Sequence, residues 1–70
     1  MQRHPVHSSV LNSAGYDPAR RILELEFKEG ETWDYFNVSQ SAYKKLITSD
    51  SIGRFFVKSI KGKYPELRIK

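Results

Sequence analysis

Few side chains in this 70-residue sequence have the types and spacing that chemistry requires. His4 and His7 are the only histidines, stand three residues apart near the amino terminus, and have no carboxylate close by in sequence. Cysteine is absent, so thiolate ligands are missing as well. A metal site needs more ligands than two histidines and a rigid frame, so we interpret this pair as solvent-exposed and expect no metal site.

Catalytic groups of other kinds are also missing. Glu24 and Glu26 alternate with apolar residues and resemble a carboxylate pair, but acid–base catalysis needs burial to shift a pKa, and we expect both side chains to be solvated on an open sheet face. The serines do not lie in a nucleophile elbow, and the four glycines are scattered, so they form no phosphate-binding loop. We therefore expect neither an enzyme nor a bound cofactor.

Basic residues are concentrated in the second half of the chain. Residues 41–70 contain eight basic and two acidic residues, whereas residues 1–40 contain four and six. On the second of two predicted helices, Arg54, Lys58 and Lys61 follow the i, i+4, i+7 spacing of one helical row. The candidate phosphate contacts are Arg54, Lys58, Lys61, Lys63, Lys44 and Lys45, with Tyr64 beside them to stack a base. The alternative is an ordinary solvated helix surface.

The aromatic residues of the segment Trp33-Asp34-Tyr35-Phe36 allow two interpretations. Alternating aromatics on a sheet can stack RNA bases, or they can pack in the core. A three-residue loop ending at Gly30 avoids a positive φ at Glu29 and sets the register of the hairpin.

This register places Leu25 opposite Trp33 and Leu23 opposite Tyr35, which favours core packing of both aromatics. Phe36 then faces the open side of the sheet together with Ile22. Those two residues are the candidate contacts for a protein partner or a second copy of the chain.

The elements that position these residues follow from periodicity. Strands are predicted within residues 7–16, 22–28 and 32–38, with a turn at residues 17–20. Ser39 caps a helix that runs to about Ser49, and Ser51 caps a second helix that ends before Gly62. The order β-β-β-α-α predicts an α+β fold, a three-stranded antiparallel meander with two helices on one face. Residues 1–5 are expected to be a flexible lead-in, 6–64 the single domain, and 65–70 a basic tail with a short extended piece at 67–69.

Composition limits the setting. Absence of cysteine favours a reducing compartment over a disulfide-stapled secreted scaffold. No stretch is apolar enough for a membrane span or a signal peptide, so we expect a cytoplasmic protein.

An ordered set of motifs resembles a known family, the KTSC domain, over residues 6–64. The residues that carry the resemblance are Ser8-Ser9, Gly15-Tyr16-Asp17, Leu23-x-Leu25-x-Phe27, Gly30, Trp33-x-Tyr35, Val38, Tyr43, Leu46, Ser51-x-Gly53-x-Phe55-Phe56, Ile60-Lys61 and Tyr64. The family is a short module found alone in bacterial proteins and at the carboxyl terminus of some lysyl-tRNA synthetases. Its central Tyr-x-Tyr reads Trp33-Asp34-Tyr35 here, and Ser39 stands where the family usually has proline.

The resemblance implies RNA as a partner, with tRNA among the candidates, which agrees with the basic second half. The leading hypothesis is a non-enzymatic RNA-binding module. The alternative is a module for protein–protein interaction, self-association included, that uses the open sheet face around Ile22 and Phe36 or an exposed strand edge.

Overall fold

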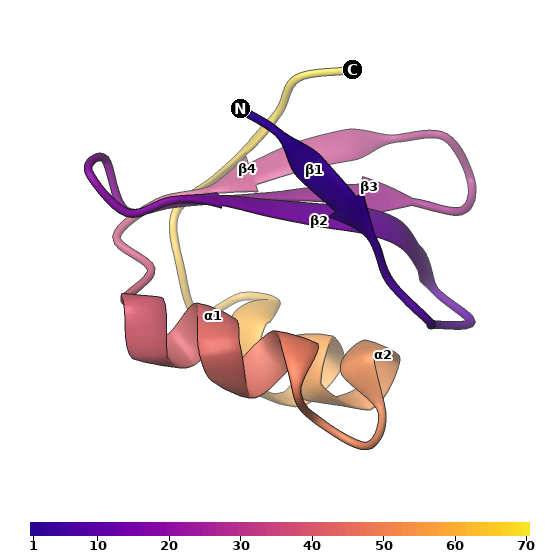
Figure 1. The fold of residues 1–70 in the computed structure, drawn as a ribbon. Helices are drawn as coiled ribbons and strands as arrows, with labels where there is room; N and C mark the ends of the chain where they lie inside the picture. Colours follow the sequence, from indigo (N-terminus) through magenta and orange to yellow (C-terminus); the bar gives the residue numbers. More distant parts are fainter.

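Five antiparallel strands form one sheet in the order β1-β2-β3-β4-β5. The strands are β1 (Arg3–Pro5), β2 (Leu11–Asp17), β3 (Ile22–Phe27), β4 (Thr32–Tyr35) and β5 (Glu66–Arg68). Between β4 and β5 the chain forms α1 (Gln40–Ile47), α2 (Ile52–Phe55) and the π-helical turn η1 (Phe56–Ile60). In the computed structural model, which describes residues 1–70, the helices lie together under one face of the sheet (Figure 1).

The α+β prediction is confirmed, but three strands were too few. The two additional strands, β1 and β5, are the edges of the sheet and come from the segments expected to be a lead-in and a tail. A proline is tolerated in an edge strand because its missing N–H can face solvent, which explains Pro5 in β1. Gly15 lets β1 approach β2 closely, because a Cβ there would lie 2.7 Å from the backbone oxygen of Gln2.

The hairpin register was predicted correctly. Leu25 pairs with Trp33, and Leu23 pairs with Tyr35. The loop closes through hydrogen bonds from the Phe27 amide to the Glu31 carbonyl at 2.8 Å and from the Gly30 amide to the Phe27 carbonyl at 2.9 Å. Gly30 has a φ of 105°, the left-handed region that favours glycine, so the loop chemistry sets which strand face each aromatic occupies.

Serine caps begin both helices, as predicted. The Ser39 hydroxyl accepts a hydrogen bond from the Ala42 amide at 3.0 Å, and the Ser51 hydroxyl accepts one from the Arg54 amide at 3.3 Å. The second helix differs from the expected regular form. Its α-helical part ends at Phe55, and the Lys61 amide donates to the Phe56 carbonyl five residues earlier at 2.8 Å, a π-helical bond.

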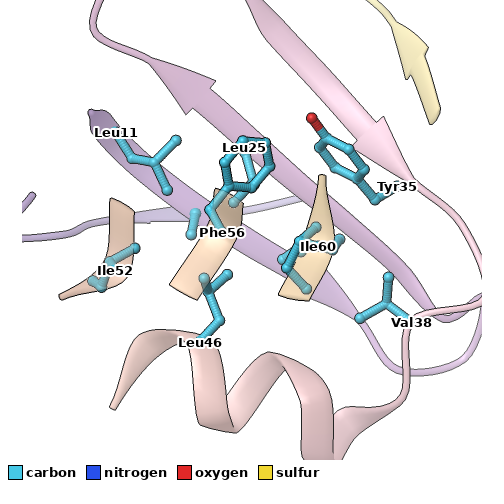
Figure 2. Packing of buried hydrophobic residues seen from close by; sticks show 10 residues of the cluster. Leu11, Leu25, Tyr35, Val38, Leu46, Ile52, Phe56 and Ile60 are labelled. Carbon is cyan, nitrogen blue, oxygen red and sulfur yellow. The ribbon is translucent and has the colours of Figure 1, made fainter. Parts of the chain in front are cut away.

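The core lies between the sheet and the helices (Figure 2). Its fully enclosed side chains come from β2, β3, the loop after β4, α1 and η1, and the largest are Leu11, Leu23, Leu25, Leu46, Ile60 and Val38. Tyr16 and Tyr43 stack at 4.8 Å between ring centroids, joining β2 to α1, and the Tyr16 hydroxyl donates to the Val38 carbonyl. No helix in the chain has the length and apolar character needed to cross a membrane.

Candidate nucleic-acid interface

The helical layer, residues 39–64, gathers most of the positive charge. It contains six basic residues and one acidic residue, a net charge of +5, whereas residues 1–38 have a net charge of −2. The six basic residues are Lys44, Lys45, Arg54, Lys58, Lys61 and Lys63, and all six are exposed. None of them forms an ion pair, because the two ion pairs of the chain are Arg3–Glu24 and Arg20–Asp17. We call these six residues the basic surface.

The predicted row of Arg54, Lys58 and Lys61 is interrupted by the π-helical turn. Lys61 has an extended backbone, with φ −61° and ψ 124°, so it does not follow Lys58 on a helical turn. Arg54 and Lys58 remain together and line a shallow hollow beside Asp50, at the connection between α1 and α2. Lys61 instead lines a pocket on the sheet side, where three glutamates also lie.

A second hollow brings Lys45 and Tyr64 together. It has a volume of about 320 Å³, and its wall includes Phe55 and Ser59 between the two. The Tyr64 ring is half-buried, so one part of it is fixed and another part is accessible. A ring held beside an unpaired ammonium group can stack a base while the ammonium contacts a phosphate. We call this feature the interhelical hollow.

The open face of the sheet, on the side away from the helices, is polar and largely paired. Arg3 donates to Glu24 at 2.6 Å, and the Ser13 hydroxyl donates to Glu26 at 2.8 Å. Glu24 is only 9% exposed, so the expectation that it would be solvated was wrong. That expectation failed because Arg3, which neutralises Glu24, lies in β1, a strand that the sequence did not reveal.

Asp34 lies opposite Glu24 in the sheet. Burial and, to a smaller extent, the neighbouring Glu24 raise the pKa of Asp34 to about 6, although the nearby Arg3 acts in the opposite direction. One oxygen of Asp34 is buried and has no hydrogen-bond partner. Sequence reasoning did not single out this pair, although the Leu25–Trp33 register places residues 24 and 34 opposite each other and could have identified it.

The candidate residues for protein interaction lie at the margin of this open face. Ile22 begins β3 and Phe36 follows β4, and both side chains are half-buried. The Phe36 amide donates to the Pro65 carbonyl at 2.9 Å, which fixes its backbone against the segment leading to β5. Whether the two residues contact a partner stays a prediction.

The remaining candidates divide between the core and the surface. Tyr35 is 3% exposed and belongs to the core, whereas Trp33 is half-buried and lines the pocket that contains Lys61. His4 and His7 are exposed and line a hollow near Asp50.

Together these features define a small two-layer α+β domain with a five-stranded antiparallel sheet and a basic helical layer. The profile of the KTSC domain matches residues 7–64, so the chain belongs to the KTSC domain family, as its motifs indicated.

Similar proteins include both short chains and long ones. A protein of Tsukamurella paurometabola is 45% identical over 51 residues, which cover 73% of this chain and 76% of that protein. A lysine–tRNA ligase from a Nostoc species is 34% identical over 56 residues, which cover 80% of this chain but 10% of the ligase.

A solved structure has the same fold. The crystal structure of a KTSC domain protein from Yersinia pestis is 43% identical in sequence and has a TM-score of 0.96, covering 99% of this chain and 97% of that one. The match includes nearly the whole chain, so the five-stranded architecture is shared with that protein.

Proposed function

We propose that this protein is a non-enzymatic RNA-binding module that contacts phosphates through the basic surface on its helical layer. The observation that carries the proposal is the gathering of six exposed basic side chains without an ion-pair partner. Unpaired lysine and arginine side chains release counterions when they contact phosphates, which favours binding to any nucleic-acid backbone.

The interhelical hollow adds a base contact to this surface. Lys45 contacts a phosphate while an unstacked base lies on the exposed part of Tyr64. Arg54 and Lys58 extend the phosphate path along the connection between the helices. Recognition in this mode depends on backbone and exposed bases, so sequence preference is weak.

Two further considerations support RNA as the partner. Lysine–tRNA ligases of Nostoc and Trichormus species contain a similar segment, and those enzymes, by name, act on a tRNA. A cysteine-free chain also suits the reducing cytoplasm, where RNA is abundant. The proposal therefore includes a cytoplasmic location and tRNA among the RNA partners.

Paired charge reversals test the proposal. Replacing Lys45→Glu together with Lys58→Glu should weaken binding of a fluorescent tRNA by roughly tenfold or more at low salt, because two phosphate contacts become repulsions. The matched control is Lys28→Glu with Lys70→Glu, which makes the same change of net charge on exposed, unpaired lysines outside the helical layer. Equal weakening by both pairs would show that only net charge matters, and unchanged affinity in the first pair would refute the assigned surface.

A further inference from the structure

An aromatic pocket lies at the end of the molecule where the β3–β4 hairpin meets β5. Four rings line it, those of Phe27, Trp33, Tyr35 and Phe56. Phe56 makes edge contacts with two of these rings, at 5.2 Å from Phe27 and 5.7 Å from Tyr35 between centroids. The cavity measures about 250 Å³, which is enough for one side chain or a small headgroup.

The charge of this pocket is opposite to that of the basic surface. Three carboxylates, those of Glu29, Glu31 and Glu66, line it, against the single ammonium of Lys61. Glu31 accepts a hydrogen bond from the Trp33 indole N–H at 2.9 Å, which fixes the ring and the carboxylate relative to each other. Arg68 lies opposite Trp33 in β5, but its Nε donates to the Lys70 carbonyl at 3.1 Å.

One polar group of the core, the Tyr35 hydroxyl, faces the pocket. Tyr35 is 3% exposed as a residue, yet it lines the pocket. Its hydroxyl oxygen is not among the buried atoms without a partner, so it is accessible from the pocket. In Figure 2 this hydroxyl points away from Ile60 and Leu46. Burial, together with Glu66, raises the pKa of Tyr35 to about 12, so the hydroxyl is neutral and can accept a hydrogen bond from an N–H donor.

We infer that the aromatic pocket binds a cationic side chain, the guanidinium of arginine or the ammonium of lysine, presented by an extended segment of a partner protein. Aromatic faces attract cations, and tryptophan does so most strongly. The three carboxylates supply the opposite charge, and the Tyr35 hydroxyl supplies an acceptor inside the pocket. The three carboxylates would repel a ligand that presents a phosphate or a carboxylate.

The position of β5 favours a peptide over a free amine. β5 is the last strand of the sheet, and no strand pairs with its outer edge. An extended segment added to that edge forms backbone hydrogen bonds and places every second side chain on one face. Glu66 lies on this edge strand and also lines the pocket, so a basic residue of the added strand has a direct path to it.

Trp33 is the only tryptophan, so its fluorescence and its indole N–H resonance report on the pocket directly. We would titrate an extended peptide that alternates threonine with arginine, the same peptide with glutamate in place of arginine, and arginine amide alone. The inference expects saturable changes in both Trp33 signals with the arginine peptide, none with the glutamate peptide, and binding of arginine amide at least about tenfold weaker. Equal affinity for arginine amide and for the arginine peptide would overturn the peptide assignment. No change in either Trp33 signal with the arginine peptide would overturn the site.

Variants separate this site from general electrostatics. Glu31→Gln with Glu66→Gln should lower the affinity for the arginine peptide by roughly tenfold. The control with the same change of net charge is Glu26→Gln with Asp50→Asn, because both residues lie outside the pocket. An equal loss of affinity in that control would refute the pocket. Lys61→Ala should strengthen peptide binding by removing a like charge and should not strengthen RNA binding. The basic surface of the RNA proposal shares only Lys61 with the pocket. Failure of either proposal therefore leaves the other standing.

Discussion

Asp34 and Glu24 place two carboxyl groups opposite each other on the open face of the sheet, with Arg3 near both. Arg3 forms an ion pair with Glu24 and stabilises the negative charge of that carboxylate. Asp34 lies in an environment that disfavours its charged form, so Asp34 holds the proton at this site. The consequence is a specific dependence of stability on pH.

The Asp34 carboxyl has a pKa of about 6 in the folded chain, above its ordinary value of 3.8. The folded state therefore binds more protons than the unfolded state between these values, and the free energy of unfolding falls as pH rises through them. Asp34→Asn mimics the protonated acid and does not titrate, so its free energy of unfolding does not fall for this reason as the pH rises. We expect the variant to melt at a higher temperature than the parent protein at pH 7 and at nearly the same temperature at pH 4.

Thermal unfolding followed by circular dichroism from pH 4 to pH 7.5 measures this difference. Glu26→Gln is the control, because Glu26 accepts a hydrogen bond from Ser13 on the same face. A melting difference between Asp34→Asn and the parent protein that does not change with pH would contradict the account.

At the scale of elements, patterns of residues predicted the long strands, the hairpin and both helix starts. The alternation of residues 22–27 and the glycine at position 30 were sufficient for register, because they determine side-chain direction and loop type. β1 and β5 were not predicted as sheet strands, because three residues are too few to show alternation. Their pairing depends on neighbours far away in the sequence.

The π-helical turn was also beyond prediction. Spacing alone does not distinguish an α-helix from a helix with one wider turn, because both bury the apolar face formed by Ile52, Phe56 and Ile60. That turn changes the candidate site, because it separates Lys61 from Arg54 and Lys58. The gathering of basic residues was predictable from composition, whereas their division between the interhelical hollow and the aromatic pocket was not.

Helix α1 depends on its serine cap. Ser39→Ala should lower the free energy of unfolding by about 1 kcal/mol, because the Ala42 amide loses its acceptor. Ser41→Ala is the matched control, since Ser41 is exposed, lies within the same helix and makes no hydrogen bond through its side chain. Urea denaturation measures both values, and an equal effect of the two substitutions would contradict the role of the cap.

At the scale of the whole molecule, the chain separates its charge by layer. Residues 39–64 have a net charge of +5 and form the helical layer, while residues 1–38 have a net charge of −2 and form four of the five strands. Such a molecule presents a positive side to an anionic partner and orients it before contact. The aromatic pocket lies at the junction of the two layers and is lined by three carboxylates, so it suits a cationic ligand instead.

The salt dependence of RNA binding by the unmodified protein tests most directly whether the basic surface contacts phosphates. Fluorescence anisotropy with labelled tRNA and with a short single strand gives the affinity at several salt concentrations. We expect binding at low salt, with a slope of log affinity against log salt concentration of about −2 to −4, because each phosphate contact on a single strand contributes about −0.7. Absence of binding at low salt, or an affinity that does not change with salt, would contradict the account and leave the basic surface without a phosphate partner.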